Sequence, residues 1–209
     1  MFKAKVRFAL LALLLPFLLN ATHILKDDIL KPEASKLIEE MADELLSKTG
    51  INGYVIATNE NFPERFNLVT YSKKYEEKLS KPYVMLIFAP NAVITTKSGE
   101  KGRVALIPSS KEIATLYDKS DVMDATIDVI AVKDKNTIED KHNIGVLQGF
   151  SELADQIAAS KDIEMTTTLP NETRLIVGIL EVIVLIGAAL VFWMFIFRPI
   201  YMRIKNGKQ

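Results

Sequence analysis

Two adjacent carboxylates near the start of the chain are the first residues whose type and spacing suit chemistry. Asp27 and Asp28 stand just before a helix-forming stretch. Such a pair can offer oxygen ligands to calcium or act in a hydrolytic site. It also suits the start of a helix, because the positive N-terminal end of a helix favours acids. We adopt this second interpretation and predict no catalytic residue, cofactor or metal site. Asp27 and Asp28 are the residues that would hold calcium if the chain bound it.

A second acidic series lies further along the chain, where three of its members have helical spacing. The series consists of Asp118, Asp121, Asp124 and Asp128. No glycine-containing calcium loop accompanies it, so we expect a solvated helix face. The two histidines, His23 and His142, are too few for a zinc site and show no partner in sequence for a serine triad. The chain has no cysteine, which excludes thiol catalysis and thiolate metal sites.

The apolar stretch at 175–197 carries another signal, because Glu181 is its one ionisable residue. At 1.5 Å per residue a helix of this length covers about 34 Å, against roughly 30 Å for a bilayer's hydrocarbon core. We therefore expect a transmembrane helix, on which Gly178, Glu181, Leu185 and Ala188 share one face. Small residues allow close approach and a buried acid seeks a polar partner, so we predict a partner-helix contact there. The alternative is that Glu181 reaches the membrane interface alone.

The two ends of the chain indicate its compartment. Residues 1–21 combine basic side chains, a short apolar run and a small final residue, as in a secretory signal cleaved after Ala21. An uncleaved signal anchor is the alternative. Residues 198–209 are basic without an acid, which is typical of the cytoplasmic side of a membrane. Between them, residues 22–173 hold 18 basic and 25 acidic side chains, a net charge of −7 that argues against nucleic acid or anionic lipid as partner.

The body of the chain alternates between strand-like and helix-like stretches. We expect strands at 51–58, 83–89, 92–96 and 103–107. We expect helices at 32–48, within 64–80, and at 109–117, 122–132 and 143–160. The stretch at 83–89 is uninterrupted by polar residues and is expected to be the central strand. The predicted fold is α/β or α+β, a small central sheet sandwiched by helices over residues 22–161. A juxtamembrane linker at 162–174 and the transmembrane helix follow.

This order of elements resembles the TPM-domain family of membrane-tethered extracytoplasmic domains. The resemblance is carried by the Asp27-Asp28 pair with the following Ile29-Leu30-Lys31-Pro32, by the helix ending at 44–50, and by the strand at 54–57. It implies a TPM-like sandwich with helices on both faces, and relatives that include photosystem repair factors, a receptor modulator, and calcium-binding proteins with acid phosphatase activity. The chain departs from the family at 75–82 and 95–99, where the usual glycine-rich motifs are missing. This loss removes backbone that could approach a phosphate or an ion closely.

Together these patterns predict a non-enzymatic accessory or chaperone-like factor of a bacterial inner membrane. It would assemble, protect or stabilise a larger integral membrane complex of the respiratory, secretory, ion-driven motor or transport kind. It would be single-pass in the lipid bilayer, with the bulk of the chain in the periplasm and the C-terminus in the cytoplasm. The alternatives are a membrane-tethered acid phosphatase or calcium-binding TPM protein, and a homo-oligomeric membrane scaffold.

Overall fold

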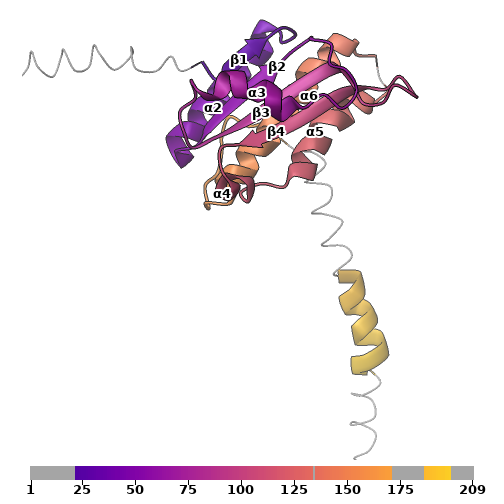
Figure 1. The fold of residues 1–209 in the computed structure, drawn as a ribbon. Coiled ribbons are helices and arrows are strands. Elements are labelled where there is room, and N and C mark those ends of the chain that lie inside the picture. The colour runs from indigo at the N-terminus through magenta and orange to yellow at the C-terminus, as the bar shows by residue number, and fades with distance from the viewer. Residues whose placement is uncertain (1–21, 134, 171–185, 199–209) are drawn as a thin grey trace, which may run out of the picture. The chain divides into compact units, whose positions relative to one another are not determined.

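A computed structural model describes residues 22–133, 135–170 and 186–198 (Figure 1). Its centre is a four-stranded sheet with the strand order β1-β2-β3-β4. The strands are β1 (Ile24–Asp27), β2 (Asn52–Ala57), β3 (Tyr83–Val93) and β4 (Lys101–Pro108). The first three strands are parallel, and β4 runs antiparallel to β3. The predicted mixed α/β fold with a small central sheet is confirmed.

The two inner strands are apolar on both faces, which explains their central position. Along β2, Val55 and Ala57 face one core, while Tyr54 and Ile56 face the other. Successive side chains of a strand point to opposite faces, so an uninterrupted apolar run needs cover on both. The expected central strand at 83–89 is confirmed within β3, which continues to Val93. The edge strand β1 was not predicted.

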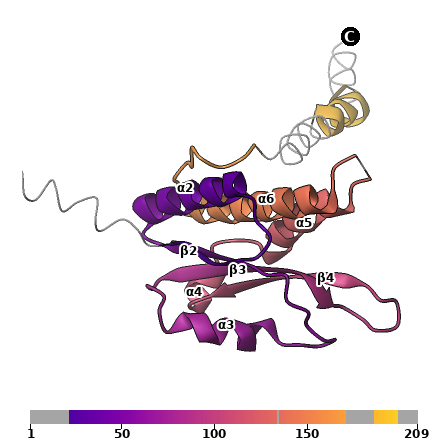
Figure 2. The same ribbon diagram turned by 90° about the horizontal axis from the view of Figure 1, so that it is seen from above.

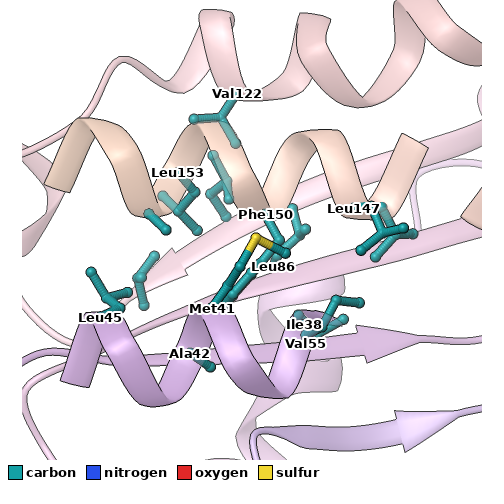
Figure 3. Packing of buried hydrophobic residues seen from close by; sticks show 14 of the residues in the cluster. Ile38, Met41, Ala42, Leu45, Val55, Leu86, Val122, Leu147, Phe150 and Leu153 are labelled. Atoms are coloured by element: carbon teal, nitrogen blue, oxygen red, sulfur yellow. The ribbon is translucent and has the colours of Figure 1, made fainter. Parts of the chain in front are cut away.

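Three helices cover the first face of the sheet. They are α2 (Pro32–Thr49), α5 (Lys119–Ala131) and α6 (Ile138–Ala159), and Figure 2 shows them on one side of the strands. Close up, Met41 and Leu45 of α2 meet Phe150 and Leu153 of α6 above Leu86 of β3 (Figure 3). These five residues are almost fully buried, and burying each such side chain contributes about 1.5–3 kcal/mol.

The second face is covered mainly by α3 (Leu68–Glu76) and the loop before it (Figure 2). Phe62, Leu68 and Tyr71 close this core from outside the sheet. The short helix α4 (Lys111–Ala114) follows β4, is capped by Ser110 and ends well before the predicted residue 117, and its Ile113 belongs to the first core. The predicted sandwich, with helices on both faces of the sheet, is therefore confirmed.

The two parallel connections have opposite hands. The chain moves in the same direction across the sheet from β1 to β2 and from β2 to β3, but α2 and α3 lie on opposite faces. Right-handed connections would place both helices on one face. One of the two connections therefore departs from the right-handed rule that nearly all such units follow.

The predicted fold class is wrong in its C-terminal part. Within the residues that the structure describes, no helix is long and apolar enough to cross a membrane. The described C-terminal helical stretch covers residues 186–198 and includes the π-helical turn η2 (Trp193–Phe197). The expected transmembrane helix is corrected accordingly. The chain divides into two compact units after Leu169.

Candidate functional site

The predicted carboxylate pair lies at the carboxyl end of β1, in the turn that leads into α2. Asp27 stabilises this turn: one carboxylate oxygen accepts from the Leu30 N–H at 2.9 Å, and the other from the Ser35 hydroxyl at 2.8 Å. The residue before α2, Lys31, makes no side-chain cap, and Asp27 bonds the turn before the helix and the Ser35 hydroxyl but no main-chain N–H of the first helical turn. Asp27 therefore links the turn before α2 to the first turn of that helix through side-chain hydrogen bonds.

Asp28 joins the ends of two neighbouring strands. Its Oδ2 accepts from the Thr58 hydroxyl at 3.0 Å and from the Asn59 N–H at 3.1 Å. Both donors follow directly after β2, and the Asp28 N–H donates to the Ala57 carbonyl at 2.9 Å. The Lys26 ammonium stands 3.2 Å from the same oxygen. The carboxylate is thus engaged by three donors from two strand ends.

A second carboxylate, Glu60, extends this arrangement toward α3. It pairs with Lys26, accepts from the Tyr71 hydroxyl at 2.8 Å, and lies 4.0 Å from the Lys74 ammonium. The Lys74 ammonium also stands over the Tyr71 ring, 3.7 Å from its centroid, in a cation–π contact. Lys26, Asp28, Glu60, Tyr71 and Lys74 form one group, which we call the strand-end network.

Sequence reasoning found only Asp28 of the strand-end network. Its members come from β1, the loop after β2, and α3, so they share no local spacing. The available signal was the position of Asp28 and Glu60 just after two parallel strands, whose carboxyl ends meet at one edge of a sheet. A search for polar residues at that edge would have paired them.

The electrostatics of the network favour fixed charges. The bond to Glu60 is the main cause that raises the pKa of Lys26, against a lowering by burial. The same bond, with that from Tyr71, lowers the pKa of Glu60. Burial would raise the pKa of Asp28, but bonds from Asn59, Lys26 and Thr58 outweigh it and lower the pKa. Burial and then Glu60 raise the pKa of Tyr71. None of these shifts brings a group toward neutral pH, where a general acid or base works best.

His23 has partners that the sequence did not reveal. Its ring is fully buried between β2 and α2, with Nδ1 3.0 Å from the Gly53 carbonyl and Nε2 3.2 Å from Asp43 Oδ1. Both of these oxygens are hydrogen-bond acceptors. The His23 N–H donates to Glu39 at 3.0 Å. These contacts make His23 an anchor of β1.

The other predicted residues are placed apart from one another. Asp118 caps α5 by accepting from the Ser120 N–H at 2.7 Å, while Asp121, Asp124 and Asp128 are exposed along that helix. His142, on α6, packs its ring against Phe88 with 5.3 Å between centroids. Burial lowers the pKa of His142. The acidic series is a helix face, and His142 has a packing role.

Metal and partner-helix predictions have different outcomes. Among residues 22–133, 135–170 and 186–198, no three His, Asp or Glu side chains are grouped so that they could hold a metal ion. Of the partner-helix face, Gly178, Glu181 and Leu185 lie outside the described residues. Ala188 lies in the helical stretch at 186–198 and is exposed.

No protein-family model matches the chain, and a search of curated proteins finds no match either.

Proposed function

We propose that residues 22–169 form a non-enzymatic accessory domain that stabilises a larger membrane-protein complex. The observation that carries the proposal is the use of Asp27 and Asp28. These carboxylates are the first candidates for chemistry, and both accept hydrogen bonds that shape the turn between β1, α2 and β2. If either carboxylate bound a substrate or metal ion instead, these hydrogen bonds would break and the edge of the sheet would lose stability.

The proposed location is the outer face of a bacterial inner membrane. The signal-like residues 1–21 and the basic residues at 198–209 support it. The proposed partner is an integral membrane complex, and recognition would use the folded surface of the domain. Membership of the TPM-domain family is kept as a hypothesis, which rests on the residues at 27–32, 44–50 and 54–57.

Affinity purification of the tagged full-length chain from native membranes tests the proposal. We expect a defined set of membrane proteins to co-purify in fixed proportion and to lose abundance when the gene is deleted. In the variant Asp28→Ala, the amount of co-purified protein should fall in proportion to the amount of folded chain and no further. Recovery of the chain alone under gentle solubilisation, with unchanged abundance of all membrane complexes in the deletion strain, would contradict the proposal.

The rival acid phosphatase makes an opposite prediction. The purified full-length chain would hydrolyse a generic phosphomonoester in the presence of calcium or magnesium. It would lose that activity in the double variant Asp27→Asn and Asp28→Asn while remaining folded. We expect no turnover above that of the double variant. Turnover that requires both carboxylates would replace the accessory function by the enzymatic one.

A further inference from the structure

Residues 163–169 turn back over the domain after α6, where the sequence pattern suggested a linker. The turn is made at Asp162, a non-glycine residue with φ of 59°. Met165 and Leu169 pack against the first core. The segment runs as an extended chain beside α2 and α6 (Figure 2). We call residues 163–169 the strap.

One carboxylate holds the centre of the strap. Glu44 of α2 accepts from the N–H of Thr166 at 2.9 Å and of Thr167 at 2.8 Å. It also accepts from both hydroxyl groups, at 2.6 Å and 2.5 Å. Lys48, one turn along the same helix, adds an ion pair at 2.7 Å. The Glu44 side chain is only 10% exposed, so this charge depends on the strap for much of its solvation.

The energetic balance at Glu44 follows from these contacts. Burial alone would raise the pKa of Glu44, but the bonds from Lys48, Thr166 and Thr167 outweigh it and hold the pKa well below its usual range. Hydrogen bonds to a charged group are stronger than those between neutral groups. A neutral side chain of the same shape would therefore bind the strap far less strongly.

The rest of the strap is also held by side chains. The Thr168 hydroxyl donates to Asp155 at 2.8 Å, and the Leu169 N–H donates to the Ser151 hydroxyl at 2.7 Å. Lys48 donates to the Glu164 carbonyl at 2.7 Å. The Ile163 N–H donates to the Ala158 carbonyl at the end of α6 at 3.0 Å, and among the described residues 164–169 form no further hydrogen bond from main chain to main chain with the sheet or the helices. The strap can therefore leave without breaking any strand or helix.

We propose that the strap opens as a unit while α2, α6 and the sheet stay folded, and that Glu44 is the residue that keeps it closed. Opening uncovers the apolar surface beneath Met165 and Leu169. It also frees Pro170 from the surface of α2 and α6, because the released strap can swing about its attachment to α6, and the extended strap spans at most about 24 Å at 3.4 Å per residue. The strap thus sets how far the domain can extend from whatever follows Pro170. This inference does not depend on the proposed function.

Hydrogen exchange of the full-length chain, followed by mass spectrometry, tests the proposal. We expect Glu44→Gln to accelerate exchange in peptides that cover 163–169 at least tenfold, with α2 and α6 unchanged. The matched control is Glu40→Gln on the same helix, where an exposed surface pair with Lys36 is lost and the strap should exchange as in the wild type. If Glu44→Gln accelerated exchange equally in α2, α6 and the strap, or nowhere, the proposal that the strap opens as a unit would be wrong.

A disulfide lock assigns the effect to the strap. The chain has no cysteine, so Asp155→Cys with Thr168→Cys introduces one pair at a point where the closed strap touches α6. The oxidised pair should return strap exchange in the Glu44→Gln background to the wild-type rate, and reduction should restore the fast rate. Failure of the pair to oxidise, or fast exchange in the oxidised chain, would contradict a closed strap at this position.

Discussion

At the scale of single residues, the charged side chains of this domain connect elements that are distant in sequence. Asp28 joins the ends of β1 and β2, and Glu60 extends that connection to α3. His23 ties β1 to α2 through Asp43. Each residue bonds polar groups that are shielded from water and would otherwise lack a partner. Removing it should therefore lower the free energy of unfolding more than removing a surface charge does.

Substituting Asp28 should destabilise the domain. Asp28→Ala leaves the Asn59 N–H and Thr58 hydroxyl without their acceptor, so we expect a loss of about 1–2 kcal/mol in the free energy of unfolding. Urea unfolding followed by circular dichroism measures it. The control is Asp124→Ala, an exposed member of the acidic series, which should change stability by less than about 0.5 kcal/mol. Equal effects would show that Asp28 is not structural.

Substituting His23 should cost more than substituting its partner. His23→Ala empties a fully buried site and removes both ring contacts, so we expect a loss of about 2–4 kcal/mol. Asp43→Asn keeps the shape of a side chain that is 60% exposed, and we expect less than about 1 kcal/mol. Thermal unfolding of the two variants gives the comparison. A larger effect for Asp43→Asn would mean that the contact with Asp43 contributes more to stability than the buried His23 ring does.

At the scale of elements, α5 and α6 are fitted together by glycine. A Cβ on Gly149 would lie 1.9 Å from the Thr126 hydroxyl oxygen, and one on Gly145 would lie 2.6 Å from the Thr126 carbonyl oxygen. Thr126 is fully buried, and its hydroxyl donates a hydrogen bond to the Val122 carbonyl at 2.9 Å. Small residues at this crossing let the two helix backbones approach closely, as in other tightly packed helix pairs.

A double-mutant cycle tests this contact. Gly149→Ala should destabilise the domain by about 1–3 kcal/mol through overpacking, despite the better helix propensity of alanine. Thr126→Ala removes the hydroxyl at 1.9 Å, so the same glycine substitution should cost at least about 1 kcal/mol less in that background. Chemical unfolding of the four chains supplies the cycle. If the stability losses of the two single variants simply add in the double variant, the Gly149 substitution does not act through the Thr126 hydroxyl.

The start of α6 was predicted too late, and the reason is local. The structure begins the helix at Ile138, five positions before the predicted residue 143. Thr137 accepts from the Asp140 N–H at 3.1 Å, and its hydroxyl donates back to the Asp140 carboxylate at 2.7 Å. The spacing of Thr137 and Asp140, three residues apart, is a known helix-start signature that can be recognised in the sequence. The apolar spacing that begins further along dominated the prediction.

At the scale of the whole domain, stability should fall with acidity in two stages. Burial lowers the pKa of His142, so the folded state resists protonation below the usual value of 6.5 and stability declines from there. The pKa values of Asp28, Glu44 and Glu60 are also lowered. Their contribution is complete above the unfolded values of about 4 to 4.5 and is lost as the pH falls through the folded values.

Unfolding free energies measured from pH 8 to pH 3 test both stages. His142→Phe removes one titrating group, so its stability difference from the wild type should be constant above about pH 7 and should change as the pH falls below the unfolded pKa of about 6.5. Glu44→Gln should flatten the curve below about pH 4.5, relative to Glu40→Gln. Increasing wild-type stability between pH 4.5 and pH 3 would contradict the assigned direction for the carboxylates.

The sequence alone determined the parts of this protein that are encoded by local pattern. Strands β2 and β3 followed from uninterrupted apolar stretches, and α2 followed from helical spacing closed by Gly50, which adopts φ of 74°. These features depend on neighbours a few residues apart, so their periodicity can be read along the chain.

Only the tertiary structure decided the features that depend on distant contacts. It placed α2 and α3 on opposite faces, where the right-handed rule predicts one face. It joined Asp28 to Glu60, and it bound Thr166 and Thr167 to Glu44, from which they are separated by about 120 residues. Hydrogen bonds and packing of this kind depend on how the chain is folded in space. They cannot be predicted from the spacing of residues within one helix or strand.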